Sequence, residues 1–133
     1  MNQNEVVERL EREDPLIAVV GATNSPGKYG GIIYRDLKAK GFRVVGVNPR
    51  TASVDGDPTY PTLADLPETP DIVDVVVPAR IGLGLIDEVE ALDDSSIWFQ
   101  PGAEDGAVRA RLETSRIPSI VDACIMVLAK SRV

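Results

Sequence analysis

Residues 16–30 decide the fold, with the sequence Leu16-Ile17-Ala18-Val19-Val20-Gly21-Ala22-Thr23-Asn24-Ser25-Pro26-Gly27-Lys28-Tyr29-Gly30. The first five residues are apolar without helical spacing, which predicts a strand buried on both faces. Small, polar and turn-forming residues follow, and a helix-like run, residues 32–39, comes next. A strand, a glycine loop and a helix in this order direct several backbone N–H groups and a positive helix end at one spot. Such a spot suits a phosphate group.

The composition predicts one ordinary domain, residues 1–133, with residues 1–14 as an N-terminal helical extension. The chain has 133 residues and is 44% hydrophobic, enough for a core. It contains no apolar run near the roughly 20 residues of a membrane span, and its charged N-terminus lacks the apolar centre of a signal peptide. A single cysteine, Cys124, fits a reducing compartment. We therefore expect a cytoplasmic protein with no membrane partner.

Charge and residue types exclude several chemistries. The net charge of −7 argues against nucleic acid, which needs a basic face, but not against a small anion held by local donors. The chain has no histidine, so it has no histidine base, phosphohistidine or histidine metal site. The sequence also lacks clustered cysteines and an Asp-rich calcium loop, so no metal site and no catalytic residue is predicted.

Hydrophobic periodicity predicts an α/β domain: a Rossmann-like, doubly wound, five-stranded parallel sheet with the first strand central. The expected strands are residues 16–20, 42–47, 71–77, 96–99 and 117–121. The expected helices are residues 4–13, about 30–40, 81–91, 104–114 and a terminal helix that Asp122 caps and that runs to about Lys130. Residues 62–66 predict one helical turn, and residues 51–61, rich in Gly, Asp, Ser and Pro, predict a loop.

The carboxyl ends of parallel strands meet at one edge, where ligands bind in such folds. The loop at that edge, residues 21–27, lacks the second glycine of the dinucleotide fingerprint, and Pro26 has no N–H to donate. It is no P-loop either, because Tyr29 stands where a Ser or Thr would hold magnesium. Its hydroxyls and amides, with Lys28, can still cradle a diphosphate, although a plain turn packed on glycines remains the alternative.

The end of the second strand discriminates between ligands. An NAD site needs a carboxylate there, but the sequence has Asn48-Pro49-Arg50 and no acid before Asp55. An arginine favours a phosphorylated ribose, which points to NADP or coenzyme A, unless Arg50 is simply solvated in a surface turn.

Three further positions complete the predicted edge. Val77-Pro78-Ala79 with Ile81 can cover an adenine face, or Pro78 can merely end a strand. Gln100 can bind a pantetheine amide or cap a turn. Cys124, expected in the first turn of the terminal helix, is either a reactive thiolate or a buried structural thiol.

These residues resemble a known family: the small stand-alone CoA-binding-domain proteins, which are similar to the N-terminal domain of the succinyl-CoA synthetase alpha subunit. The resemblance spans about Ile17 to Met126. It rests on Val20-Gly21-Ala22-Thr23, Ser25-Pro26, Lys28-Tyr29-Gly30, Gly41-Phe42-Arg43-Val44, Val47-Asn48-Pro49, Asp71-Ile72-Val73-Asp74, Ile97-Trp98-Phe99-Gln100-Pro101-Gly102 and Val121-Asp122-Ala123-Cys124. It implies coenzyme A at the carboxyl edge, with residues 23–26 at the diphosphate, the 48–50 turn as a basic position, residues 77–79 at the adenine and residues 99–100 as the fourth-strand contact.

The chain departs from the family in places. The ligase loop is richer in glycine, and the stand-alone proteins often have Phe-Arg where Val77-Pro78 stands. Those proteins also often carry a glutamate shortly after the cysteine, where this sequence has Val127-Leu128. The phosphohistidine of the ligase lies in a second domain, so the resemblance implies binding and not acyl transfer.

The expected function is therefore binding of coenzyme A or an acyl-CoA without catalysis. The predicted cofactor-binding residues are Gly21, Thr23, Asn24, Ser25, Pro26, Lys28, Tyr29, Asn48, Pro49, Arg50, Val77, Pro78, Ala79, Ile81, Phe99, Gln100 and Cys124. The alternatives are an NADP-dependent reductase, a redox module in which Cys124 forms a mixed disulfide with the CoA thiol, and a subunit that hands CoA to a partner enzyme. We also expect a homodimer, because small sheets often bury an apolar helix face by self-association.

Overall fold

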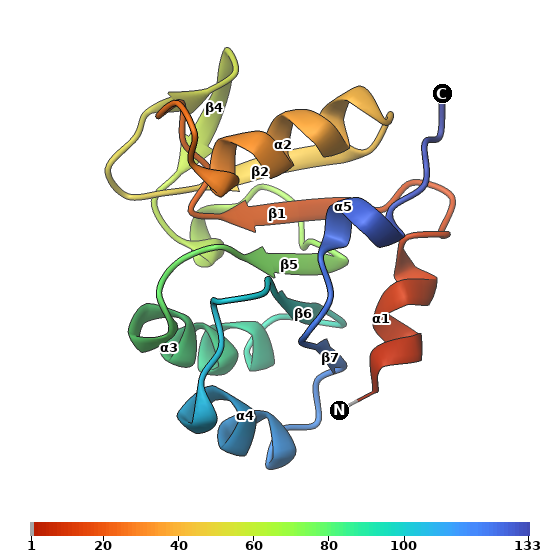
Figure 1. Ribbon diagram of the computed structural model, residues 1–133, viewed down its shortest axis with the longest axis vertical. Helices are drawn as coiled ribbons and strands as arrows, with labels where there is room; N and C mark the ends of the chain where they lie inside the picture. The colour runs from red at the N-terminus through yellow and green to blue at the C-terminus, as the bar shows by residue number, and fades with distance from the viewer. Residues whose placement is uncertain (1) are drawn as a thin grey trace.

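The computed structural model describes residues 2–133. One sheet of order β3-β4-β2-β1-β5-β6-β7 crosses the molecule (Figure 1). Its strands are β1 (Leu16–Val20), β2 (Arg43–Val47), β3 (Ser53–Val54), β4 (Asp57–Tyr60), β5 (Ile72–Val75), β6 (Ser96–Phe99) and β7 (Ser119–Ile120). The helices are α1 (Gln3–Arg9), α2 (Tyr29–Ala39), the short 3-10 turn η1 (Leu63–Asp65), α3 (Ala79–Glu90), α4 (Gly106–Glu113) and α5 (Ile125–Leu128).

The five expected strands are present and parallel, but the expected count is wrong. Residues 51–61, predicted to be a loop, contain β3 and β4; β4 pairs parallel with β2, and β3 pairs antiparallel with β4. Without β3, the strands follow the chain order 3-2-1-4-5-6 of the Rossmann sheet. The segment was missed because β4, Asp57–Tyr60, lacks an apolar run and contains a proline.

Helices cover both faces of the sheet, so strand β1 is buried along its whole length. Helices α1, α2 and α5 pack on one face around Ile17, Val19 and Trp98. Helices α3 and α4, with η1, pack on the other face around Val73 and Phe99. None of the helices within residues 2–133 combines the length and hydropathy that a membrane span requires.

One carboxyl group interrupts the first of these faces. Asp74 lies in the middle of β5, between Val19 of β1 and Trp98 of β6 in register. It is fully buried, and neither carboxylate oxygen has a hydrogen-bond partner within the described residues. Burial raises the pKa of the Asp74 carboxyl well above its ordinary value.

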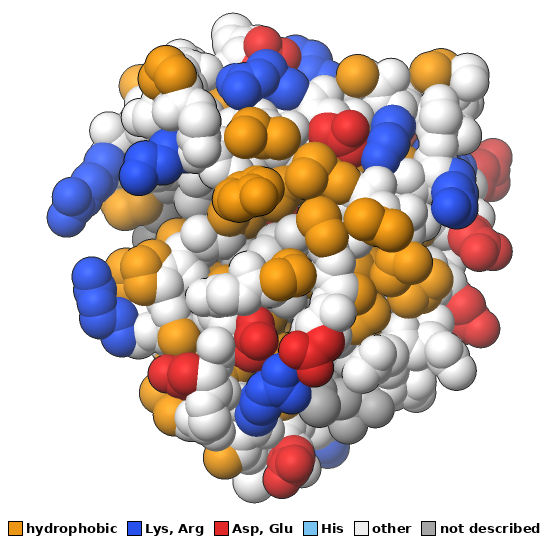
Figure 2. All heavy atoms as spheres, viewed as in Figure 1, with side chains coloured by type: hydrophobic (Ala, Val, Ile, Leu, Met, Phe, Trp, Pro, Cys, Tyr) orange, Lys and Arg blue, Asp and Glu red, His pale blue; other side chains and the backbone are white. Residues whose placement is uncertain are grey.

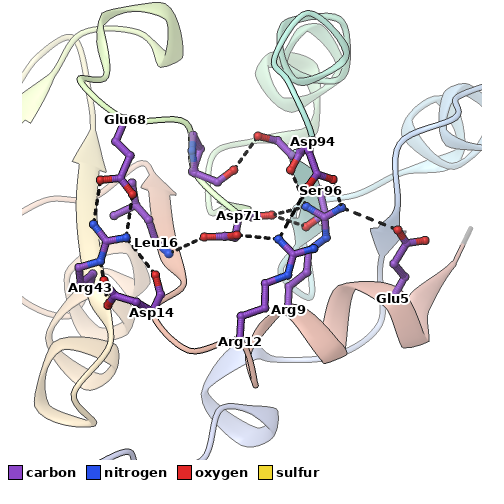
Figure 3. A network of polar contacts seen from close by, with 12 residues as sticks. Glu5, Arg9, Arg12, Asp14, Leu16, Arg43, Glu68, Asp71, Asp94 and Ser96 are labelled. Carbon is purple, nitrogen blue, oxygen red and sulfur yellow. Dashed lines mark hydrogen bonds and ion pairs between the residues drawn. The ribbon is translucent and has the colours of Figure 1, made fainter.

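Charged side chains attach α1 to the amino edge of the sheet (Figure 3). The Arg9 guanidinium, 2% exposed, pairs with the Asp94 carboxylate at 2.8 Å and donates to the Asp71 carbonyl oxygen at 3.1 Å. Arg12 pairs with the Asp71 carboxylate at 2.7 Å. Nearby, Arg43 donates two hydrogen bonds to Glu68, at 2.9 and 2.7 Å, and this contact lowers the pKa of the Glu68 carboxyl.

The last residues of the chain hold the segment that follows α1. The Arg132 guanidinium donates to the carbonyl oxygens of Leu10, Arg12 and Glu13 at 2.8, 2.7 and 3.0 Å. The same guanidinium lies over the Phe42 ring, 5.4 Å from its centroid. The C-terminal residues are thus fixed to the segment between α1 and β1.

Candidate functional site

A cavity of about 920 Å³ opens at the carboxyl edge of the sheet. Its volume lies in the range of small-molecule and cofactor pockets. The tips of β1, β2, β5 and β6, the first turn of α2 and the N-cap residue of α5 build it. It is lined by Gly21, Thr23, Ser25, Lys28, Tyr29, Gly30, Asn48, Arg50, Val76, Val77, Pro78, Gln100, Pro101, Gly102, Ala103 and Cys124.

A second cavity of about 430 Å³ adjoins the first. Both share Gly21, Asn48, Arg50, Val77 and Pro78, so they meet at the tips of β1, β2 and β5. The second cavity is also lined by Val20, Val47, Pro49, Pro61, Thr62, Leu63, Arg80, Ile81, Leu85 and Glu88. In Figure 2 the edge toward which the β1 arrow of Figure 1 points is hollowed, and Lys and Arg side chains stand on both sides of the hollow.

Glycines set the shape of the loop between β1 and α2. Gly21 has φ +103°, a region that favours glycine, and its N–H donates to the Val47 carbonyl oxygen at 2.9 Å. A Cβ on Gly30 would lie 2.0 Å from the Gly21 carbonyl oxygen, and one on Gly31 would lie 2.3 Å from the Thr23 carbonyl oxygen. Helix α2 can therefore approach the loop only because its first turn carries two glycines.

The N-terminus of α2 faces the first cavity through Lys28, Tyr29 and Gly30. The first N–H groups of a helix have no partner within the helix, so they can donate to an anion. The Thr23 and Ser25 hydroxyls lie 3.3 Å apart on the loop between β1 and α2. The Ser25 N–H is already used, because it donates to the Thr23 hydroxyl oxygen at 3.2 Å.

Asn48 joins the loops after β1 and β2. Its side-chain NH₂ donates to the Ala22 carbonyl oxygen at 2.9 Å, and its side-chain oxygen accepts from the Arg50 N–H at 2.9 Å. Asn48 therefore lines the cavity while it fixes the backbone on both sides of it.

Lys28, Arg50 and Arg80 give the two cavities positive charge. Within residues 2–133, no acidic side chain forms an ion pair with any of the three. The side chains that line the first cavity include no carboxylate. Among these described residues, no group of three or more carboxylates and thiols is arranged to hold a metal ion. The edge is thus suited to a phosphate-bearing organic anion.

At the β6 tip, Gln100 is almost fully buried and is hydrogen-bonded at both ends. Its side-chain oxygen accepts from the Ile125 N–H at 3.0 Å, and its side-chain NH₂ donates to the Cys124 sulfur at 3.2 Å. Cys124 itself is the N-cap of α5 and lines the first cavity.

The expectation that Asp122 caps the terminal helix is wrong, and so is the expected length of that helix. Asp122 has φ +64° and forms an ion pair with Arg109 at 2.7 Å, while α5 has only four residues. The backbone turns once more after Asp122 before the helix begins.

Thirteen of the seventeen predicted site residues line one or both cavities, which leaves Asn24, Pro26, Ala79 and Phe99. Phe99 is fully buried beneath α3, where a Cβ on Gly82 would lie 2.8 Å from its ring. The Asn24 side chain turns away from the cavity, toward β3.

Sequence reasoning missed several lining residues, among them Gly30, Val76, Arg80, Thr62 and Leu63. Arg80 could have been predicted, because it lies just after β5, in a segment that the sequence places at the ligand-binding edge. Leu63 begins η1 and Thr62 is its N-cap, and the position of this turn beside the edge depends on the missed strand β4.

Comparisons with known proteins identify relatives of this chain. Residues 16–130 match the family described as CoA binding domain. Over 100 residues, the chain is 30% identical to an ADP-forming acetate–CoA ligase I of Archaeoglobus fulgidus; the match covers 74% of this chain and 15% of the ligase. The chain therefore spans only a small part of that relative.

Solved structures of similar size share the fold. A Thermus thermophilus protein titled cell-free ID.343 is 33% identical, with a TM-score of 0.82 and 96% of each chain covered. A conserved hypothetical protein from Pyrococcus furiosus is 38% identical, with a TM-score of 0.79, and the match covers 86% of this chain and 97% of that one.

Proposed function

This chain belongs to the family of CoA binding domains, and from that premise we propose that it holds coenzyme A, free or acylated, in the two joined cavities without converting it. The observation that carries the proposal is the combination of unpaired cations, free helix N–H groups and an apolar wall along one continuous edge. Coenzyme A requires these three features, because it combines phosphates, an adenine ring and a long neutral arm.

The glycine loop is the proposed diphosphate site. The first N–H groups of α2, the Thr23 and Ser25 hydroxyls and the Lys28 ammonium border the first cavity together. A helix N-terminus and hydroxyl donors stabilise phosphate oxygens without a metal ion.

Arg50 is the proposed partner of the ribose phosphate. It lines both cavities and is exposed, and no carboxylate competes for its guanidinium within the described residues. Val77, Pro78 and Ile81, which border the second cavity, supply an apolar surface for the adenine ring.

The pantetheine arm would follow the β6 tip toward Cys124. Gln100, Pro101, Gly102 and Ala103 line this part of the first cavity. The Gln100 side chain already bonds Ile125 and Cys124, so we assign it to shaping the channel rather than to a new hydrogen bond with the arm.

Binding without turnover is supported by the residue types at the edge. The chain has no histidine, and the titratable side chains that line the first cavity are Lys28, Tyr29, Arg50 and Cys124. The family match favours CoA over the NADP-dependent reductase that an arginine after β2 also permits.

Calorimetric titration of the ligand-stripped protein with CoA, dephospho-CoA, NADP and NAD in parallel tests the proposal. We expect tight binding of CoA, weaker binding of dephospho-CoA, and little heat from NADP or NAD. Preference for NADP would overturn the proposal in favour of a dinucleotide enzyme. Absence of binding by all four ligands would mean that the glycine loop is only a turn.

A further inference from the structure

The short hairpin of β3 and β4 lies beside the glycine loop and is hydrogen-bonded to it by the Asn24 side chain. The Asn24 NH₂ donates to the Ser53 carbonyl oxygen at 3.2 Å, and the Asn24 side-chain oxygen accepts from the Asp55 N–H at 2.9 Å. Asn24 does not line either cavity. Its carboxamide therefore ties the centre of the loop to the hairpin.

The geometry of the hairpin leaves the Ser53 carbonyl and the Asp55 N–H free to bond with Asn24. Asp55 and Gly56 have φ +50° and +81°, the signs of a two-residue turn with positive φ at both positions. Such a turn leaves the N–H of its first central residue outside the strand ladder. Ser53 faces Pro58, and the ladder bond from the Thr59 N–H goes to Ala52, so the Ser53 carbonyl is free to face Asn24.

The hairpin is in turn fixed to α2, the helix that begins at the end of the loop. The buried Tyr34 hydroxyl donates to the Asp57 carboxylate at 2.7 Å. Lys38 pairs with Asp57 at 2.9 Å and with Asp55 at 3.2 Å. Both helix residues point to the hairpin, so loop, hairpin and helix form a closed ring of contacts.

The hairpin also fixes the segment that carries Arg50. The Asn48 N–H donates to the Tyr60 carbonyl oxygen at 2.9 Å, and the Thr59 hydroxyl donates to the Thr51 carbonyl oxygen. Residues 48–52 are thus held at both ends while the Arg50 side chain remains exposed at the cavity rim.

We propose that the β3–β4 hairpin is a brace that holds the glycine loop and the Arg50 segment in their binding geometry before the ligand arrives, and that Asn24 is the positioning residue through which it acts on the loop. This inference rests on the proposed function, because the geometry that it preserves is that of the phosphate site. It assigns Asn24, whose sequence position predicts a ligand contact, a role through the hairpin.

A preformed loop raises the observed affinity without touching the ligand. When only a fraction of molecules has the binding geometry, the observed Kd rises by the inverse of that fraction. The two Asn24 hydrogen bonds are lost in Asn24→Ala, and we expect the Kd for CoA to rise roughly tenfold, the scale of one or two neutral hydrogen bonds.

The experiment is a double-mutant cycle on the full chain, with CoA affinity measured by calorimetry. The second substitution is Gly56→Val, because Gly56 has φ +81°, has no atom within 4 Å of an added Cβ and lines neither cavity. The Gly56→Val substitution strains the turn at a position outside both cavities. Asn4→Ala, an exposed asparagine of α1, is the matched control and should leave the Kd unchanged.

The brace predicts that each single variant weakens CoA binding and that the double variant is no weaker than the worse single one, since both break the same link. Hydrogen exchange of the ligand-free protein should speed up at residues 22–27 in both variants, while the circular dichroism spectrum of Asn24→Ala stays that of the wild type. The brace is overturned if Gly56→Val binds CoA as the wild type does, or if the two losses multiply, as a direct Asn24 contact would require. A wild type that does not bind CoA would instead refute the proposed function.

If Gly56→Val does not fold, Tyr34→Phe provides the second arm of the cycle. It removes the hydroxyl that bonds Asp57 and leaves the Lys38 pair in place. The same outcomes apply, with a smaller expected rise in Kd than for Asn24→Ala, because one of the contacts to the hairpin remains.

Discussion

At the scale of single residues, Arg50 is the proposed partner of the ribose phosphate. Its guanidinium stands where the two cavities meet, and no acid pairs with it within the described chain. Arg50→Ala should weaken CoA binding by about 1–3 kcal/mol, the value of a hydrogen bond to a charged group. Binding of dephospho-CoA should hardly change, because that ligand lacks the ribose phosphate. Calorimetry on both ligands measures the difference.

Arg116→Ala is the control for Arg50, since Arg116 is exposed and lines neither of the two cavities at the carboxyl edge. The Arg116→Ala substitution removes one positive charge, as Arg50→Ala does, but at a distant position. An equal loss of affinity for CoA and dephospho-CoA in Arg50→Ala would assign the arginine to another part of the ligand.

The residue types predicted which backbone segments form the site, but not the direction in which the polar side chains point. The glycine loop and the Asn48–Arg50 turn were predictable, because glycines, hydroxyls and an arginine at strand ends carry their chemistry in the sequence. Gln100 and Asn24 were not, because their amides bond to α5 and to the hairpin, and both partners are distant in the chain. A polar side chain at a strand tip can face the ligand or the protein, and tertiary packing decides which.

At the scale of elements, strand β5 carries a destabilising group. The Asp74 carboxyl is fully buried and unpartnered among the described residues, and burial raises its pKa well above 3.8. Above pH 3.8 the unfolded chain releases this proton while the folded chain keeps it. The folded state then binds more protons, so the free energy of unfolding falls as pH rises from about 4 toward the folded-state pKa.

Asp74→Val should therefore stabilise the protein, and the gain over the wild type should grow from pH 4 to pH 7, by up to about 1.4 kcal/mol per pH unit. Urea unfolding at several pH values measures it. Asp93→Asn, at an exposed position, is the control and should give a flat difference. A stability gap for Asp74→Val that is the same at pH 4 and pH 7 would show that Asp74 does not keep its proton in the folded state.

The β3–β4 hairpin shows which strands hydrophobic periodicity does not detect. Periodicity finds strands that are buried, such as β1 and β5, but β3 and β4 have only two and four residues and are partly exposed. Their signal was the Asp55-Gly56 pair, a typical two-residue turn. Composition alone suggested a loop, because the same residues that make a tight hairpin turn also make irregular chain.

At the scale of the whole molecule, a C-terminal residue stabilises the segment that follows the N-terminal helix. Arg132 donates to three carbonyl oxygens after α1 and lies over Phe42. Both α1 and Arg132 lie outside residues 16–130, the part that matches the family. Arg132→Ala should lower the free energy of unfolding by about 1–2 kcal/mol, because three charge-assisted hydrogen bonds are lost, two of them exposed to solvent. Chemical denaturation measures the loss.

A lysine at this position separates the charge from the geometry. Arg132→Lys keeps the charge but cannot reach three carbonyls as a planar fork does, so we expect an intermediate loss. The ligand affinity should be the same in all three proteins, because the contact lies far from the carboxyl edge. Wild-type stability of Arg132→Ala would mean that α1 is held by Arg9, Arg12 and its apolar contacts alone.

The overall strand order followed from the sequence, because the glycine loop after the first strand and the alternation of strands and helices favour a Rossmann-like sheet with that strand in the centre. The ion pairs at the amino edge did not follow. Arg9 and Asp94 are distant in the chain, and neither residue type nor spacing indicates that a guanidinium will be buried against that carboxylate.

The rim cations Lys28, Arg50 and Arg80, which have no ion-pair partner within residues 2–133, also bear on how the proposed polyanionic ligand reaches the two cavities. The chain as a whole carries a charge of −7, so its distant field repels a highly charged nucleotide. That repulsion is screened beyond about 8 Å at physiological ionic strength, whereas the rim acts at contact range. Added salt therefore raises the association rate by screening the repulsion, and it also weakens the contacts between the ligand and the rim cations. Binding is therefore decided late in each diffusional encounter, when the ligand has come within contact range of the rim cations.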